Sequence, residues 1–581
     1  MRLPFQQYRD LFASYLKHQW PGVALLAALV LGSIGLQLVN PQIMRFFIDT
    51  ATSGGAPGRL TAAALLFMGV ALVDQAASVG ATYLGENLGW TATNKLRADL
   101  AHHCLRLDMS FHKARTPGEM IERLDGDVTV LANFFSQFGI RLLSNTILLF
   151  GVLALLFRED WRIGLPLTGF AVLALITLNR VRGVAVPHWV LARQASADFF
   201  GFLEERLSGI EDIRASGATA YVMRRFFQLL RERLHKERKA GLMGSVMGAT
   251  ITALFTLGHA LAFAVGAWLF LAGTITIGTV FLITRYTSML LHPLMQISHQ
   301  IEDLQKASAS IARIQEIYHT HSKIQDGPGA PFPSGALSVE FRRVSFAYDA
   351  GDAVLHNLSF SLAPGRTLGL LGRTGSGKTT LARLLFRLYD PTAGVIRLGS
   401  VDIRAARLAH LRQRVGMVTQ DVQLFRGTVR DNLALFDRSV SDDQILQVLQ
   451  QLGLWEWYRS LSQGLDTELE SGGGGLSAGE AQLLAFTRVF LRDPGLVILD
   501  EASSRLDPAT EQLIERAVDR LLRHRTGIII AHRLATIHRA DEIMILEDGH
   551  IREHGPREQL VSDPTSRFSN LLQTGLEEAL V

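Results

Sequence analysis

Eight consecutive residues in the second half of the chain have the types and spacing needed to hold phosphate groups. From Gly372 to Thr379 they read Gly-Arg-Thr-Gly-Ser-Gly-Lys-Thr. The glycines let backbone N–H groups wrap around phosphate oxygens, and a helix that starts here offers its positive N-terminal end. Lys378 can reach the β- and γ-phosphates, while the Thr379 hydroxyl can ligate Mg²⁺. We predict a nucleoside triphosphate site formed by Gly372, Arg373, Thr374, Gly375, Ser376, Gly377, Lys378, Thr379 and Thr380.

Two adjacent acidic residues, Asp500 and Glu501, follow the apolar run Leu496–Leu499. Phosphoryl transfer needs charge neutralisation by a metal and a group that positions the attacking nucleophile. We predict that Asp500 holds Mg²⁺ through water and that Glu501 polarises the attacking water. A solvated loop explains such a pair equally well by itself. The catalytic interpretation therefore depends on the phosphate-binding loop.

The elements that must position these residues are short apolar strands that alternate with helices. In open α/β sheets, ligands bind at the carboxyl ends of the strands. This arrangement would bring Gly372, Gln420, Asp500 and His532 to one edge of a sheet. The predicted strands are Thr367–Leu371, Arg414–Val418, Leu496–Leu499, Gly527–Ala531 and Glu542–Leu546.

The composition divides the chain into two unlike halves. At 581 residues it is too long for one ordinary domain, and roughly the first 320 residues hold most of the long apolar stretches. The net charge of +4 is small, and arginine lies beside apolar runs. We therefore interpret the basic residues as determinants of membrane orientation and predict no nucleic-acid partner. The single cysteine, Cys104, excludes an intramolecular disulfide. For Cys104 and its neighbours His102 and His103 we expect packing or surface placement and not a metal site.

Six segments of the first half are long and apolar enough to cross a bilayer, which takes about 20 residues. Between them, short connections with few positive charges alternate with two long connections rich in Arg and Lys, 95–135 and 180–239. Positive residues favour the cytoplasmic side, so we predict a cytoplasmic location for the long connections and both termini. An amphipathic helix is expected in the interface before Trp20. The predicted spans are Pro21–Ile48, Leu60–Leu84, Phe138–Phe157, Trp161–Leu178, Ala249–Ala272 and Ile275–Ile297.

The long connections keep a helical apolar pattern, which predicts helices that continue out of the membrane. We expect Thr116–Leu124 and Leu207–Arg214 to contact the second half; the alternative is a solvated hairpin. Six polar residues fall inside apolar runs: Asp74, Gln75, Asn145, His259, Arg285 and His292. A charge at mid-bilayer costs about 2.5–3.5 kcal/mol, so we expect such residues to face the bundle interior or a watery cavity. Asp74, His259 and Arg285 either line a substrate path or form hydrogen bonds between helices, or they lie nearer the headgroups.

A further motif, Leu476-Ser-Ala-Gly-Glu480, lies between the phosphate-binding loop and Asp500. This set of motifs resembles the nucleotide-binding domain of ATP-binding cassette (ABC) transporters, and the whole chain resembles an ABC exporter half-transporter. The resemblance implies an all-α six-helix transmembrane domain over residues 1–320, a linker over 321–336, and an α/β P-loop ATPase domain over 337–581.

The resemblance also implies roles for residues whose type alone says little. Tyr348 matches the aromatic residue that stacks on the adenine of ATP, and Gln420 matches the residue that binds Mg²⁺ and contacts the membrane helices. Asp507 matches the D-loop aspartate, and His532 matches the switch histidine on the γ-phosphate, which we group with Glu501 as catalytic. The implied metal ligands are Thr379, Gln420 and Asp500.

Ser477 and Gly479 would contact ATP held by a second such domain, so the resemblance implies head-to-tail pairing of two halves. Ala478 and Glu480 stand where Gly and Gln are usual, and residues 470–473 lack the charged pair expected there. The catalytic residues are nevertheless all present. This combination favours a heterodimer over a homodimer.

The resemblance thus implies ATP-driven export of an amphipathic drug, lipid or peptide across the cytoplasmic membrane. ATP and Mg²⁺ are the expected cofactors, and membrane lipids and a second half-transporter are the expected partners. A lipid flippase differs from this only in its substrate. An ATP-gated channel or membrane regulator is a second alternative, which the intact Glu501 and His532 disfavour.

Overall fold

A computed structural model describes residues 17–133, 139–348, 351–419, 422–470, 472, 476–500, 508–531 and 537–574. The chain forms two compact units. We call Met1–Leu105 with Pro117–Thr320 the helical unit, and Arg106–Thr116 with His321–Val581 the sheet unit. The short segment Arg106–Thr116 thus belongs to the sheet unit although it lies early in the chain.

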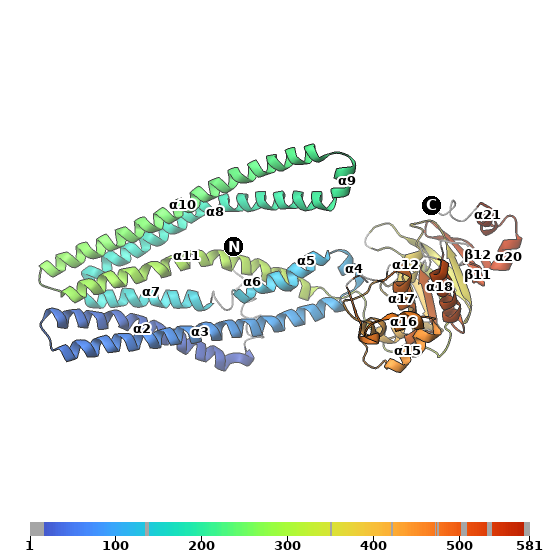
Figure 1. Cartoon of the computed structure of the whole chain (residues 1–581), viewed down its shortest axis with the longest axis horizontal. Helices are drawn as coiled ribbons and strands as arrows, with labels where there is room; N and C mark the ends of the chain where they lie inside the picture. The colour runs from blue at the N-terminus through green and yellow to red at the C-terminus, as the bar shows by residue number, and fades with distance from the viewer. Residues whose placement is uncertain are drawn as a thin grey trace. The chain divides into compact units, whose positions relative to one another are not determined.

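Helices make up the described part of the helical unit, and four of them are far longer than a bilayer requires (Figure 1). Crossing takes about 20 residues, whereas α3, α8, α10 and α11 contain 50, 48, 53 and 43 residues. The predicted continuation of the long connections as helix is confirmed. The elements are α2 (Trp20–Thr52), α3 (Pro57–Arg106), α5 (Pro117–Ile121), α6 (Asp127–Asn133), α7 (Gly139–Glu159), α8 (Trp161–Ser208), α9 (Ile210–Ala215), α10 (Thr219–Leu271) and α11 (Ile277–His319).

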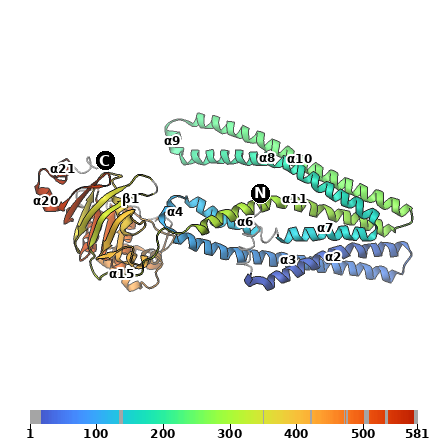
Figure 2. The ribbon, with the colours of Figure 1, turned by 180° about the vertical axis from the view of Figure 1, so that it is seen from behind.

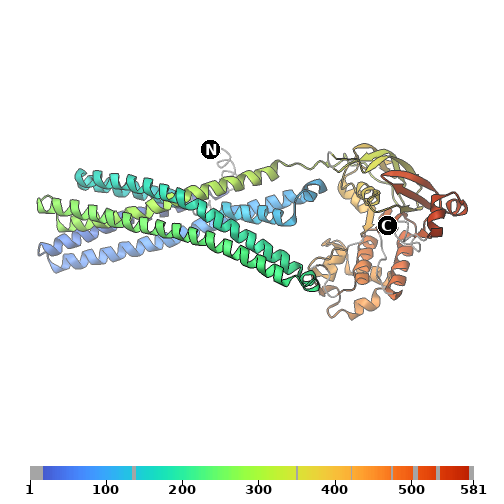
Figure 3. The same cartoon turned by 90° about the horizontal axis from the view of Figure 1, so that it is seen from above.

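Within the described residues, five helices have the length and composition to cross a membrane: α2, α3, α7, α8 and α10. The sixth predicted span, Ile275–Ile297, corresponds to the first part of α11. The helices α8 and α10 lie side by side and are joined through α9, as Figure 3 shows. The expected interfacial helix before Trp20 lies mostly outside the described residues.

Tight turns join α2 to α3, α7 to α8 and α10 to α11 at one end of the helical unit (Figure 1). Gly54 and Gly273 have φ values of +72° and +71°, which glycine adopts without the steric cost of a Cβ atom. The Asp160 carboxylate caps α8 by accepting a backbone N–H at 2.7 Å. Asp49 of α2 accepts the backbone N–H of Gly278 at 2.9 Å, which ties α2 to the start of α11.

Beyond the apolar segments, α3, α6 and α11 pack through a second buried cluster that includes Leu100 and Cys104. Cys104 is only 4% exposed, so of the two expected placements, packing and surface, the structure shows packing. Asp127 of α6 is also buried, and it accepts hydrogen bonds at 2.8 Å from the Ser310 hydroxyl and from Nε of Arg313, both on α11. Burial of this carboxylate is tolerated because its charge is paired and hydrogen-bonded.

The sheet unit contains two larger sheets (Figure 2). A six-stranded sheet has the order β12-β11-β3-β10-β9-β6 and is parallel except for β12. A four-stranded antiparallel sheet has the order β2-β1-β4-β5. The strands are β1 (Val339–Phe346), β2 (Leu355–Leu362), β3 (Thr367–Leu371), β4 (Ala393–Leu398), β5 (Val401–Asp402), β6 (Val415–Val418), β7 (Gly427–Thr428), β8 (Glu468–Leu469), β9 (Leu496–Asp500), β10 (Thr526–Ile530), β11 (Glu542–Glu547) and β12 (His550–Pro556).

The two faces of the six-stranded sheet pack against different partners. Leu370 of β3 shares a buried core with Phe341 of β1 and Leu384 of α12, so the smaller sheet and α12 cover one face. Val497 of β9 shares a second core with helices α17 and α18. The helices are α4 (Met109–Lys113), α12 (Lys378–Leu385), α13 (Leu408–Arg414), α14 (Val429–Ala434), α15 (Asp442–Gln451), α16 (Trp455–Ser460), α17 (Ala478–Arg492), α18 (Pro508–Leu522), α20 (Arg557–Ser562) and α21 (Arg567–Thr574).

Candidate functional site

The phosphate-binding loop connects the end of β3 to the start of α12, as the sequence predicted. Gly372, Gly375 and Gly377 have φ values of +150°, +87° and +104°, a region that side chains rarely adopt. A Cβ atom on Gly372 would lie 2.2 Å from the backbone oxygen of Leu546. The glycines are therefore required by the backbone path and by its close approach to β11.

Two polar groups of this loop are buried at the start of α12. Lys378 is 5% exposed, and its ammonium donates to the backbone oxygens of Gly372 at 2.5 Å and Arg373 at 3.0 Å. The Ser376 hydroxyl is buried and has no hydrogen-bond partner among the described residues. Buried polar groups are nearly always hydrogen-bonded. A phosphate oxygen would satisfy this hydroxyl, so the loop fits a phosphate ligand.

Tyr348, the predicted adenine-stacking residue, lies beside α12. Its hydroxyl is 2.8 Å from the Thr380 hydroxyl and accepts a hydrogen bond from Arg383 at 3.1 Å. The Lys113 ammonium lies 4.2 Å from the centre of the Tyr348 ring. Such cation–π contacts contribute about 0.5–1 kcal/mol at exposed sites. This aromatic residue is thus held by contacts with both α12 and α4.

The strand register places Asp500 near the phosphate-binding loop. Ile530 of β10 pairs with Leu370 of β3 and with Asp500 of β9, so these residues lie at one level. Asp500 is two strands away from β3, which corresponds to about 10 Å at the usual strand spacing. The exposed Thr379 hydroxyl and this carboxylate are oxygen ligands of the kind that Mg²⁺ prefers. These residues therefore fit Mg²⁺.

Four of the predicted site residues, Gln420, Glu501, Asp507 and His532, lie outside the described residues. The strands that lead to three of them are described. β6 ends two residues before Gln420, β9 ends one residue before Glu501, and β10 ends two residues before His532. Because these strands are parallel neighbours, their carboxyl ends meet at the edge that carries the phosphate-binding loop.

The motif Leu476–Glu480 forms the start of α17. The Ser477 hydroxyl accepts the backbone N–H of Glu480 at 3.2 Å, and the Glu480 carboxylate accepts the backbone N–H of Ser477 at 2.7 Å. This reciprocal pair is a capping box, which satisfies two N–H groups at the helix start. Ser477 is exposed and Gly479 is buried. Glutamate at position 480 therefore preserves the local structure of the motif.

The helix α4 joins the sheet unit through its N-cap residue, Asp108. This carboxylate accepts backbone N–H groups from Lys323 at 2.6 Å, Ser110 at 3.0 Å and Phe111 at 3.3 Å. Burial would raise the pKa of Asp108, but these hydrogen bonds outweigh it and lower the pKa below its ordinary value. The segment Arg106–Thr116 belongs to the sheet unit. It ends where Thr116–Leu124 begins, the segment that we expect to contact the second half of the chain.

Within the helical unit, two of the three polar residues singled out from the sequence line a cavity. Asp74 and Arg285 line one of about 540 Å³ together with Gln37. His259 instead bonds the Ser288 hydroxyl through Nε2 at 2.9 Å, which links α10 to α11. The interhelical alternative therefore holds for His259. It holds for Asp74 as well, because this α3 carboxylate accepts a hydrogen bond from the Ser33 hydroxyl of α2 at 2.5 Å.

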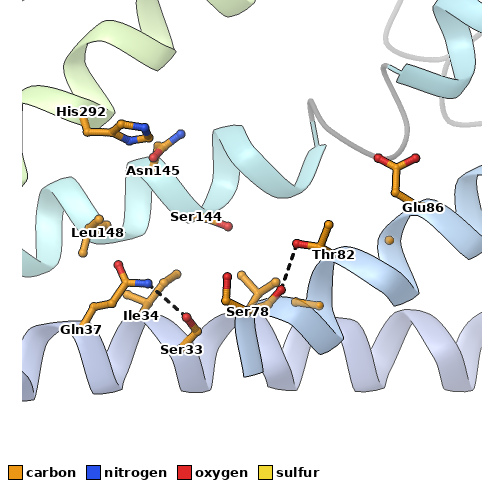
Figure 4. Close-up of a pocket in the computed structure, with 13 residues that line it drawn as sticks. Ser33, Ile34, Gln37, Ser78, Thr82, Glu86, Ser144, Asn145, Leu148 and His292 are labelled. Carbon is orange, nitrogen blue, oxygen red and sulfur yellow. Dashed lines mark hydrogen bonds between the residues drawn. The ribbon is translucent and has the colours of Figure 1, made fainter. Parts of the chain in front are cut away.

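A second cavity, of about 270 Å³, is lined in part by Asn145 and His292, two of the span residues expected to face the bundle interior or a cavity (Figure 4). Its α3 side was not predicted from the sequence. Its polar lining includes Ser78, Thr82 and Glu86 of α3 and Asn145 of α7. The spacing of four residues between the three α3 residues was the signal available. The predicted second span ended at Leu84, which left Glu86 out.

Comparisons with known proteins agree with this two-part organisation. The family model described as "ABC transporter transmembrane region" matches residues 23–294, and the model described as "ABC transporter" matches residues 355–504. A structure of a bacterial Atm1-family ABC exporter with ATP bound superposes with a TM-score of 0.77 at 26% identity. It covers 96% of this chain and 98% of its own.

Curated relatives span nearly the whole chain. The Bacillus subtilis (strain 168) ABC transporter ATP-binding protein YknV is 31% identical over 92% of this chain and 89% of its own length. A probable multidrug resistance ABC transporter of the same organism, YheH, is 31% identical over 81% of this chain and 70% of its own length. A fatty acid ABC transporter of Mycobacterium bovis has the same identity over 81% and 74%. This chain therefore belongs to the ABC transporter family, as an exporter in which the transmembrane and ATP-binding regions are fused.

Proposed function

We propose that this chain is one half of a dimeric exporter of the cytoplasmic membrane that moves an amphipathic drug, lipid or peptide outward. The observation that carries the proposal is the phosphate-binding loop, with its three positive-φ glycines and the unsatisfied Ser376 hydroxyl. It occurs in the same polypeptide as helices long and apolar enough to cross a membrane. Both termini face the cytoplasm in this proposal.

The chemistry is assigned to the edge of the six-stranded sheet. The loop N–H groups and Lys378 bind the phosphates of ATP, and Tyr348 stacks on the adenine. Asp500 and Thr379, with Gln420, hold Mg²⁺, which supplies charge neutralisation when bound. Glu501 positions the attacking water, and His532 contacts the γ-phosphate. Asp507, the D-loop aspartate, belongs to the surface between two such domains.

A complete ATP site requires a second chain. ABC exporters function as dimers, and we assign Ser477 and Gly479 to the ATP held by the opposite half. Our proposed partner is a different half-transporter, because Ala478 and Glu480 depart from the usual motif while the catalytic residues are present. An ATP-dependent lipid flippase, which would carry lipid alone, is the second candidate, and the similarity to a fatty acid transporter favours it.

The central test is Glu501→Gln in the native assembly reconstituted into proteoliposomes. We expect ATP binding to persist while ATP hydrolysis and substrate accumulation fall at least about a hundredfold, because the water loses its positioning base. A suitable control is Glu558→Gln, on an exposed position of α20. Turnover that survives Glu501→Gln would contradict the catalytic assignment.

A further inference from the structure

A row of polar side chains runs along one side of α3. Asp74, Ser78, Thr82 and Glu86 follow one another at four-residue intervals, so they lie along one side of the helix. The last three line the cavity of about 270 Å³ in Figure 4, which we call the inner cavity. Asp74 lines the cavity of about 540 Å³, which we call the outer cavity. Gln37 lines both, so the two cavities share a wall.

The two cavities differ in depth along the helices. At 1.5 Å per residue, Asp74 lies about 25 Å and Glu86 about 43 Å along α3 from Pro57. Arg285 lies about 12 Å from the start of α11. Since the hydrocarbon core is about 30 Å thick, the orientation proposed above places Glu86 at the cytoplasmic mouth of the bundle. It places Arg285 in the outer half.

The cavities also differ in charge. The described side chains that line the inner cavity include the Glu86 carboxylate and the His292 imidazole, and none of them belongs to lysine or arginine. No described residue forms an ion pair with Glu86. In the outer cavity, by contrast, Asp74 accepts a hydrogen bond from the Ser33 hydroxyl at 2.5 Å, and Arg285 adds a positive charge. A carboxylate that has no ion-pair partner among the described residues attracts a cation more strongly in a partly desolvated cavity than it would in water.

We infer that the inner cavity binds the positively charged head of an amphipathic amine. This inference rests on the proposed function, because it names the substrate class. Glu86 pairs with the ammonium group, and the hydroxyls of Ser78 and Thr82 accept its remaining N–H groups. Leu148 and Ile34 add apolar surface to the same cavity. A volume of about 270 Å³ suits a head group better than a whole drug-sized ligand.

The arrangement also gives the transport path a direction. Glu86 attracts the amine at the cytoplasmic mouth, whereas in the outer cavity the positive charge of Arg285 opposes the attraction of Asp74, so the amine is held less strongly there. A fatty acid lacks the attraction at the mouth, since its carboxylate is repelled at Glu86. Chain-matched amphiphiles that differ only in the head group can therefore test the inference.

The experiment measures ATPase stimulation in nanodiscs by a twelve-carbon amine, the matching alcohol and the matching fatty acid. We expect the amine to stimulate at the lowest concentration. In Glu86→Gln, the amine concentration for half-maximal stimulation rises about tenfold relative to the alcohol, as expected for losing one charge-assisted hydrogen bond. In Glu86→Lys, the preference shifts from the amine to the fatty acid.

Glu558→Gln is the matched control, because it removes an exposed carboxylate from the sheet unit, and it leaves all three responses unchanged. A stronger response to the fatty acid in the unmodified protein overturns the inference, and so does an unchanged amine response in both Glu86 variants. In either case ATP-driven export stands. Absence of any ATP hydrolysis in the unmodified assembly overturns the proposed function itself.

Discussion

At the scale of single residues, the phosphate-binding loop requires glycine at positions where a Cβ atom would clash or where φ is positive. Gly372 and Gly375 both have a positive φ, but they differ in their surroundings. A Cβ atom on Gly372 would overlap the backbone oxygen of Leu546, whereas a Cβ atom on Gly375 would meet nothing within 4 Å. Backbone atoms of a central strand cannot move aside as a flexible side chain can, so the two glycines have separate physical roles.

Gly372→Ala should therefore be much more damaging than Gly375→Ala. For Gly375→Ala we expect only the cost of an unfavourable φ, about 1–2 kcal/mol. For Gly372→Ala we expect an additional loss of ATP affinity of at least about a hundredfold, because the loop and β11 must move apart. Thermal unfolding and equilibrium ATP binding measure the two effects. Equal affinities in the two variants would contradict the role assigned to the contact with Leu546.

At the scale of elements, α4 shows how a five-residue helix can be held in place. Too short to be stable alone, it depends on contacts at both ends. Asp108 binds the backbone N–H of Lys323 at its start, and Lys113 lies over the Tyr348 ring at its end. A change in α4 should therefore be felt at Tyr348, which is hydrogen-bonded to the first turn of α12.

Asp108→Ala should loosen α4. Loss of an N-cap costs about 0.5–2 kcal/mol, and we expect faster hydrogen exchange over residues 106–116. The lowered pKa of Asp108 means that its contribution to stability is complete above its unfolded-state pKa. This contribution is lost as the pH falls through the lower folded-state value. Amide hydrogens of residues 106–116 should therefore exchange more slowly in the wild type than in Asp108→Ala at neutral pH. The two rates should become equal only in strong acid, where Asp108 is protonated. Asp108→Asn, which keeps an acceptor oxygen, is the matched control. Unchanged exchange in Asp108→Ala at neutral pH would show that α4 is held by other contacts.

At the scale of the whole molecule, the parts that could be predicted from the sequence are those specified locally. Glycine spacing identified the loop at Gly372–Thr379, and short apolar runs located the five strands that lead to the edge of the sheet. The membership of Arg106–Thr116 in the sheet unit depends on contacts between residues more than 200 positions apart, such as Asp108 with Lys323. No local pattern encodes such contacts. The α3 side of the inner cavity escaped prediction for a related reason, since Glu86 and Asn145 line one cavity only when α7 lies near α3.

Pairing of two chains is the largest-scale feature, and it can be tested by unequal effects of two substitutions in the native assembly. In the proposed heterodimer, the active site combines the phosphate-binding loop of this chain with the Ser477-type motif of its partner. Lys378→Ala should then reduce ATP hydrolysis by at least about a hundredfold. Ser477→Asp should have a much smaller effect, because Ser477 faces the partner's weaker site. Aspartate is chosen because it also caps helices well, so α17 stays intact, while its charge repels a γ-phosphate. A homodimer predicts that both substitutions abolish hydrolysis, since every site would then contain the altered motif. Equal and complete loss would therefore exclude the heterodimer.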